Sequence, residues 1–249
     1  MQLLIRHSVA LLGASFGPVH AGKLNVLLWR ARARLYSAVV NIQLGPVNYL
    51  HVPRTGGTSM KHWLAGVTES TIMVHDHAPK SFHVKPPVRY VVAWRMPSQR
   101  LASALARANS NTEIARKVAT MTNLQLKSIR SLGRLQVPEL ENRIRASSWR
   151  RRYVAYLSLN CAGELTEPFA SWISKKDLVE NPPVFAFSFE DSNTLESFMR
   201  QDLGLEITDR PWFNRGNGDR IFGPTPNLDS FFSEDLEVIA LLRTIFKKV

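Results

Sequence analysis

A short glycine-rich segment, HVPRTGGTS at residues 51–59, has the residue types that bind an anion. Gly56 and Gly57 allow close backbone approach and a positive φ, so that successive N–H groups can converge on one ligand. Thr58 and Ser59 add hydroxyl donors at the start of a predicted helix, and the arginine adds a fixed positive charge. The segment therefore indicates a site for a phosphate-like group. A plain turn between a strand and a helix, without a ligand, is the alternative.

A second cluster, RMPSQRLASA at residues 95–104, follows the apolar run 88–94. Arg95 stands directly after this predicted strand, where a guanidinium can form two parallel hydrogen bonds to a phosphate. Ser103 lies about two turns along the following helix and can add a hydroxyl contact. Arg100 lies on a different face of that helix, where we expect it to be solvated or paired with an acid.

Neither cluster fits the common nucleotide-binding patterns. The phosphate loop of nucleoside triphosphatases reads G-x-x-x-x-G-K-S/T, whereas this chain has Gly57 or Thr58 in place of the lysine. The dinucleotide pattern G-x-G-x-x-G is also missing. A phosphoryl-transfer kinase is accordingly disfavoured.

Taken together, the two motifs resemble those of sulfotransferases that use 3′-phosphoadenosine 5′-phosphosulfate, in particular the carbohydrate (heparan-sulfate-2-O-type) family. HVPRTGGTS is similar to that family's 5′-phosphosulfate loop, in which lysine usually stands at the position of Arg54. RMPSQRLASA is similar to its 3′-phosphate motif, R-x-P-x-x-R-x-x-S-A. The resemblance covers about residues 47–107, with weaker similarity from 184 onward. It implies an α/β, three-layer, P-loop-like fold with a mostly parallel sheet flanked by helices.

The resemblance implies that the chain is an enzyme that moves a sulfonate group from this nucleotide to a hydroxyl, that of a carbohydrate in the first place. No metal is implied, and no specific nucleic acid. The donor-binding residues implied are Arg54, Thr55, Gly56, Gly57, Thr58, Ser59, Arg95, Ser103 and, on a weaker match, Arg215. Arg54 keeps the charge of the usual lysine but not its compact ammonium. A chain that binds the nucleotide and transfers poorly is therefore the alternative.

The segment Val74-His75-Asp76-His77 supplies the predicted base. Imidazole has an ordinary pKa of about 6.5, which suits removal of a proton from the acceptor at neutral pH. His77 is the first candidate and His75 the second, with Asp76 as a group that could orient one of them. A pair of surface or core histidines without chemistry is the alternative, and metal binding lacks a third ligand at a suitable spacing.

The composition excludes several classes of protein. The 249 residues carry 32 Lys+Arg against 20 Asp+Glu, a formal charge of +12, and 45% are hydrophobic. This apolar share excludes wholesale disorder, the single cysteine excludes an internal disulfide, and no apolar run approaches the roughly 18–20 residues that span a bilayer. No acid precedes Glu69, and the stretch 116–152 is strongly basic, so an anionic partner is expected. A non-catalytic basic protein that binds nucleotide, glycan or nucleic acid is therefore a second hypothesis.

Strands alternate with helices along the chain, which predicts a largely parallel sheet. The predicted strands are 47–52, 88–94 and 184–189, and the predicted helices are 24–42, 98–108, 193–203 and 233–246. We expect residues 1–44 to form an amphipathic, basic extension and 45–249 a single domain with a helical insertion around 110–180. Residues 24–42 could contact a membrane surface, and the first 22 loosely resemble a signal peptide. A cytoplasmic location is favoured over a secretory lumen.

Overall fold

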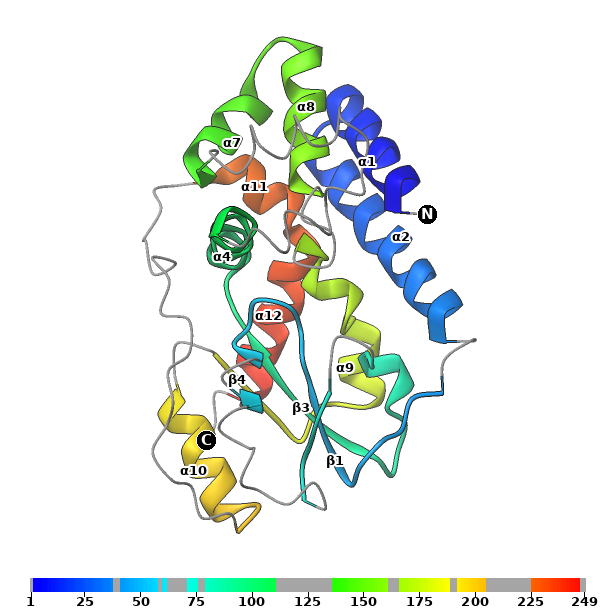
Figure 1. Ribbon diagram of the computed structural model, residues 1–249, viewed down its shortest axis with the longest axis vertical. Coiled ribbons are helices and arrows are strands. Elements are labelled where there is room, and N and C mark those ends of the chain that lie inside the picture. Colours follow the sequence, from blue (N-terminus) through cyan, green and yellow to red (C-terminus); the bar gives the residue numbers. More distant parts are fainter. Residues whose placement is uncertain are drawn as a thin grey trace. The chain divides into compact units, whose positions relative to one another are not determined.

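The computed structural model describes residues 2–37, 41–57, 60–61, 71–75, 79–110, 136–160, 166–188, 192–204 and 225–246. The chain is an α/β protein whose described strands form one parallel sheet (Figure 1). Two compact units make up the chain. The sheet unit comprises Arg30–Arg95, Phe169–Arg215 and Glu237–Val249, and the helical unit comprises Met1–Trp29, Met96–Pro168 and Gly216–Leu236.

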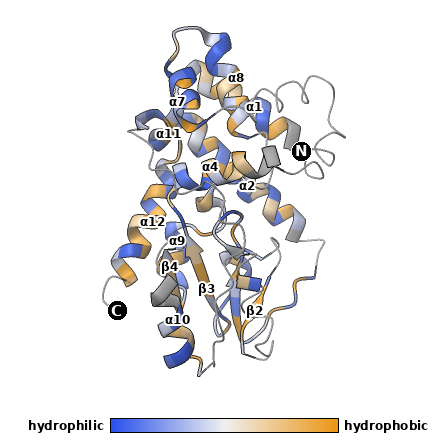
Figure 2. Ribbon diagram, turned by 60° about the vertical axis from the view of Figure 1, so that its left-hand side comes forward, coloured by the Kyte–Doolittle hydropathy of each residue, from blue (hydrophilic) through white to orange (hydrophobic). Residues whose placement is uncertain are grey.

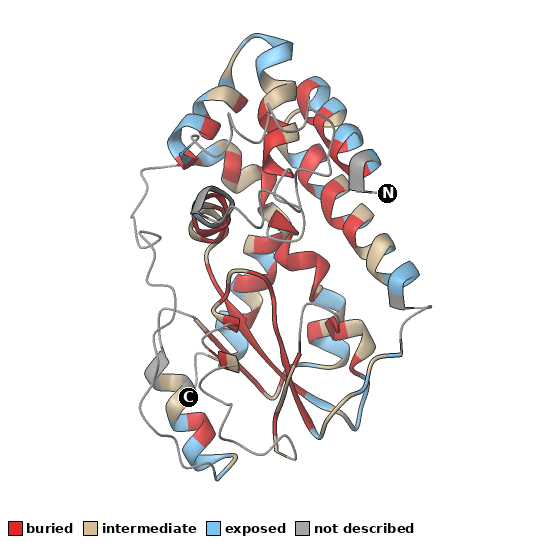
Figure 3. Ribbon diagram, in the orientation of Figure 1, coloured by how far each residue is buried: buried red, intermediate tan, exposed pale blue. Residues whose placement is uncertain are grey.

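The sheet has the strand order β2-β1-β3-β4, and all of its pairings are parallel. The strands are β1 (Val47–Leu50), β2 (Met73–Val74), β3 (Arg89–Trp94) and β4 (Phe185–Ser188). β1 and β3 are buried along almost their whole length (Figure 3), as expected for a parallel sheet that is covered on both faces. This burial explains why the predicted strands are continuous apolar runs rather than alternating ones.

Aromatic packing closes the core of the sheet unit. α10 (Ser192–Gln201) packs against β4, and the rings of Phe185 and Phe198 stack with their centroids 4.2 Å apart. Burying such side chains contributes on the order of 2 kcal/mol each. The core residues of this unit are Val47, Tyr49, Met60, Ile72, Val91, Ala93, Phe185, Phe187, Phe198 and Met199. The same unit contains the short helices η1 (Ser81–His83), η3 (Phe169–Ser171) and α9 (Lys175–Glu180).

The helical unit is built around the contact of α1 with α8. Its elements are α1 (Gln2–Phe16), the first half of α2 (Pro18–Ser37), α4 (Pro97–Ser110), α7 (Val137–Arg145), α8 (Trp149–Leu159), α11 (Pro226–Phe231) and the start of α12 (Ser233–Phe246). A Cβ at Gly13 would lie 2.5 Å from the Tyr156 ring, so glycine is what allows α1 to approach α8 this closely. The α8 residue Arg152 donates to the carbonyl of Ala14 through two nitrogens, at 3.1 and 2.9 Å.

The predicted elements agree with the structure where the apolar pattern is long. β3, α4, α10 and α12 lie within two residues of the predicted bounds, whereas α2 begins at residue 18 rather than 24. The two-residue strand β2 and the six-residue helix α11 were not predicted, because neither is long enough to show a period. α1 and the start of α2 belong to the helical unit, and their buried side chains are part of its core. Within the described ranges, no helix combines the length and apolar character needed to cross a bilayer.

Candidate functional site

The chain turns sharply after β1. The amide of Val52 donates to Leu50 O at 2.9 Å, and the Thr55 hydroxyl donates to Val52 O at 2.8 Å. Arg54 has φ of 68° and Gly56 has φ of 86°. Glycine adopts this left-handed region freely, but an arginine there costs on the order of 1–2 kcal/mol. Such strain is typically kept where a backbone position serves a function.

The loop then leads into a helix that is packed directly on an imidazole. Gly57 is in helical conformation, and the amide of Met60 donates to Gly56 O at 3.0 Å. The ring of His51 lies against Gly57, where a Cβ would be 1.7 Å from Cδ2 and 1.9 Å from Nε2. Any other residue at this position would have to displace the His51 ring. The buried ring of His51 thus packs against the backbone of the loop at Gly57.

Arg95 follows β3 directly and is buried, with 6% of its surface exposed. β1 and β3 are adjacent and parallel, with Leu50 paired to Val92, so residues 51–57 and Arg95 leave the sheet at the same carboxyl edge. In the order β2-β1-β3-β4, the chain passes to one side after β1 and to the other side after β3. Ligands of open α/β sheets bind at such a switch between neighbouring strands. The two predicted phosphate-binding segments therefore flank the switch point.

His75 is held by Asn48 on the neighbouring strand. The Asn48 amide donates through Nδ2 to the carbonyls of Gly45 (2.8 Å) and Arg89 (3.1 Å), which fixes Oδ1 as an acceptor. This Oδ1 accepts from Gly45 N at 2.9 Å and lies 2.7 Å from His75 Nε2. Nε2 therefore carries a proton, and Nδ1 is the ring nitrogen that can accept one. His75 is buried beside β1 and makes a structural contact as well as being a candidate base.

Tyr49 does not compete with the histidines as a base. Its phenol is fully buried below the loop, and burial raises its pKa above the ordinary value while the nearby Thr55 side chain opposes the shift. The phenol stays protonated at neutral pH. Tyr49 contributes to the core of the sheet unit.

The second motif continues into the helical unit. Ser103 on α4 is buried, as expected for a residue on the inner face of this helix. Arg100 lies 3.6 Å from Asp235, with both side chains almost fully buried, so of the two predicted alternatives the structure shows the acid partner and not the solvated side chain. Burial lowers the pKa of Arg100, and the charges of Asp235 and Glu167 oppose this. Arg95 belongs to the sheet unit, so a shared phosphate between Arg95 and Ser103 remains a prediction.

Four predicted site residues, Thr58, Ser59, His77 and Arg215, lie outside the described residues, as does Asp76. The described part of the predicted donor site consists of Arg54, Thr55, Gly56, Gly57 and Arg95, all in the sheet unit, and of Ser103 in the helical unit.

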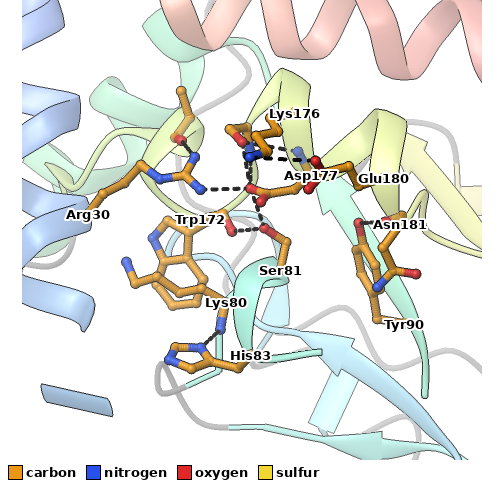
Figure 4. A network of polar contacts seen from close by, with 12 residues as sticks. Arg30, Lys80, Ser81, His83, Tyr90, Trp172, Lys176, Asp177, Glu180 and Asn181 are labelled. Atoms are coloured by element: carbon orange, nitrogen blue, oxygen red, sulfur yellow. Dashed lines mark hydrogen bonds and ion pairs between the residues drawn. The ribbon is translucent and has the colours of Figure 1, made fainter. Parts of the chain in front are cut away.

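A polar network that the sequence analysis missed fastens the sheet unit (Figure 4). Asp177 Oδ2 accepts from Arg30 at 2.8 Å and from the Ser81 hydroxyl at 2.9 Å. The hydroxyl and the amide of Ser174 both donate to the same oxygen at 2.7 Å. Burial raises the pKa of Asp177, but the bonds from Ser174 and Arg30 outweigh it and leave the pKa below its ordinary value. The spacing of Ser174 and Asp177 is a capping box, a signal that was present in the sequence.

A second buried group of this network contains a cation and a histidine. The ammonium of Lys80 lies 4.2 Å from the centre of the Trp172 ring, and the amide of Lys80 donates to His83 Nδ1 at 2.8 Å. Burial, and then the charge of Lys80, lower the pKa of His83 to about 4, while the backbone bond opposes the shift. His83 is neutral under ordinary conditions and acts here as an acceptor.

In the described part of the chain, no three histidine, cysteine or acidic side chains are grouped as metal ligands would be. Comparisons of the chain with family models, with curated proteins and with solved structures gave no significant match.

Proposed function

We propose that the chain is a sulfotransferase that uses 3′-phosphoadenosine 5′-phosphosulfate and acts on a hydroxyl group, with a carbohydrate as the acceptor class, on a three-layer P-loop-like fold. One observation carries the proposal: the strained, glycine-containing loop after β1 and the buried Arg95 after β3 lie at one sheet edge, at the strand switch. The distance between neighbouring parallel strands is about 4.8 Å, so both segments are within reach of one nucleotide that has an anionic group at each end.

The loop suits the 5′ end of this nucleotide. Backbone amides at a helix N-terminus stabilise an anion. Gly57 has no side chain to cover these amides, and a larger residue there would meet the His51 ring. The left-handed backbone of Arg54 keeps a guanidinium within the same turn. We assign the 5′-phosphosulfate to residues 54–59 and the 3′-phosphate to Arg95.

The transfer itself needs little more than positioning and charge neutralisation. The acceptor oxygen forms a bond to sulfur while the bond from sulfur to the bridging oxygen breaks, and this electron pair leaves with adenosine 3′,5′-bisphosphate. The loop amides and Arg54 would stabilise the leaving phosphate. The acceptor proton would pass to an imidazole, either His77 or His75, and in His75 to Nδ1 because Nε2 is held by Asn48.

Calorimetry with two nucleotides tests the binding half of the proposal. Adenosine 3′,5′-bisphosphate should bind more tightly than adenosine 5′-monophosphate by about 10- to 150-fold, the value of a charge-assisted hydrogen bond. Equal affinities would remove the 3′-phosphate site and, with it, the assignment of the nucleotide.

A nucleotide-binding protein without transfer activity is the second candidate, and the arginine at position 54 favours it. The bulkier, planar guanidinium is less suited than an ammonium to reach the bridging oxygen as the bond breaks. Release of adenosine 3′,5′-bisphosphate from the donor, measured with an acidic oligosaccharide as acceptor, distinguishes the two. We expect Arg54→Lys to retain or raise turnover, and a loss of activity in that variant would contradict the lysine-like role of Arg54.

A further inference from the structure

Helices α1, α2 and α8 of the helical unit expose large apolar side chains that the core does not use. Leu4 and Phe16 on α1 are 72% and 68% exposed, and Leu27 on α2 is 65% exposed. The others on these helices within the unit are Leu11, Val19 and Trp149. Single exposed leucines are ordinary, but these six account for most of the exposed large apolar side chains that the structure describes. We call them the outer apolar residues.

The outer apolar residues are additional to a complete inner face. On α1, Ile5, Val9 and Ala10 are buried, whereas Leu4 and Leu11, which are seven residues or about two turns apart, are both exposed. On α2, Val19 and Leu27, which are eight residues apart, are both exposed. Figure 2 shows apolar positions interleaved with polar ones along both helices. Each helix is thus apolar on two faces, and one of them faces water.

An aromatic pair borders this surface. Trp149 is 45% exposed, and its indole nitrogen donates to Ser15 Oγ of α1 at 3.4 Å. Trp149 stacks on Tyr153 with a centroid distance of 5.2 Å, and the Tyr153 hydroxyl lies 2.6 Å from His7 Nδ1. Tryptophan and tyrosine with one wet and one apolar end are enriched at the boundary between water and lipid.

The charge of these helices selects for an anionic partner. None of α1, α2 and α8 contains an aspartate or glutamate. Lys23 on α2 and both Arg150 and Arg151 on α8 are exposed. Arg150 and Arg151 also line, with Arg143 and Val154, a concavity of about 450 Å³ next to the Trp149 end of α8. Each exposed cation adds about 1 kcal/mol of attraction to an anionic leaflet.

We propose that the outer apolar residues of α1 and α2, with Trp149, dock the protein onto the surface of an anionic phospholipid bilayer, with the helices lying in the interface. The absence of acids argues against a second copy of the chain as the occupant, because two copies would face each other with like charges. The exposed leucines argue for lipid over nucleic acid, because an apolar side chain gains nothing from contact with a phosphate backbone. This inference is independent of the proposed sulfotransferase activity.

Co-sedimentation of the full chain with vesicles tests the proposal. The vesicles are phosphatidylcholine alone or with about 30% phosphatidylserine, in about 0.15 M salt. The test variant is Leu4→Gln/Leu11→Gln/Leu27→Gln, since glutamine keeps the helix propensity of leucine. The matched control is Val179→Gln, which removes a 77% exposed apolar side chain from α9 in the other unit. Circular dichroism checks that both variants keep the wild-type helix content.

The wild-type chain and the control should bind the anionic vesicles and not the neutral ones, and higher salt should weaken this binding. Each leucine that inserts contributes about tenfold, so the triple variant should bind about 1000-fold more weakly. Wild-type binding by the triple variant would overturn the proposal in favour of a purely electrostatic contact. Absence of vesicle binding by the wild type would also overturn it. So would a sedimentation analysis in which the wild type and the control are dimers and the triple variant is a monomer.

Discussion

The positive φ of Arg54 allows its structural and functional contributions to be separated. Arg54→Gly and Arg54→Ala both remove the guanidinium, but only glycine adopts a φ of 68° without strain. The alanine variant keeps the left-handed strain of about 1–2 kcal/mol. The glycine variant avoids this strain, but its unfolded chain is more flexible, which lowers its stability by about 0.5–1 kcal/mol. The glycine variant should therefore be more stable than the alanine variant by about 1 kcal/mol, or about 2–4 °C in Tm for a chain of this size.

Nucleotide affinity should not follow stability in these two variants. Each loses one charge-assisted hydrogen bond to the 5′-phosphate, which weakens adenosine 3′,5′-bisphosphate by about 10- to 150-fold. Thermal unfolding and calorimetry on the same preparations give both quantities. Equal stabilities of the two variants would refute the strain argument. Wild-type affinity in either variant would refute the role of Arg54 as a phosphate ligand.

Three further predictions concern stability and local packing. Because the pKa of His83 is lowered to about 4, the unfolded chain binds a proton more readily than the folded one, so the free energy of unfolding should fall as the pH drops from about 6.5 to about 4. His83→Asn, which keeps an acceptor for the backbone amide, should flatten this part of the pH profile; an unchanged profile would assign the effect elsewhere. Arg100→Gln leaves Asp235 buried without its cation and should cost about 3–5 kcal/mol, whereas Arg143→Gln, from an exposed pair, should cost less than about 1 kcal/mol in urea denaturation. Similar losses in both would show that burial does not govern the pair. Gly57→Ala must displace the His51 imidazole, so it should lower the free energy of unfolding by about 1–3 kcal/mol and weaken nucleotide binding. A variant with wild-type stability and affinity would show that the close approach of His51 to Gly57 is unimportant.

The sequence predicted the elements that carry the candidate site because these are long, buried and regularly patterned. The apolar run of β3 and the glycines after β1 identify a strand end and a turn, and parallel strands end at a common edge when they are neighbours. That β1 and β3 are neighbours could not be read from the sequence, because strand order depends on long-range packing. The short strand β2 on the other side of β1, which places the switch point, has only two residues.

The contacts that the sequence could not supply are those between distant residues. The hydrogen bond from His75 Nε2 to Asn48 Oδ1 joins positions 27 apart, and neither residue type predicts the other. The assignment of α1 to the helical core depends in the same way on Gly13 fitting against Tyr156. For Arg100 the sequence left open whether the side chain is solvated or paired with an acid, and it could not identify Asp235 as the partner.

The central claim is that the loop after β1 and Arg95 hold opposite ends of one nucleotide, and affinities of two variants for two nucleotides test it most directly. Arg95→Gln should bring adenosine 3′,5′-bisphosphate down to the affinity of adenosine 5′-monophosphate and leave the latter nearly unchanged. Arg54→Gly should weaken both nucleotides by the same factor and preserve the preference between them. If Arg95→Gln keeps the full preference for the 3′-phosphate, or if it weakens both nucleotides equally, the two segments do not share the ligand in this way and the account is contradicted.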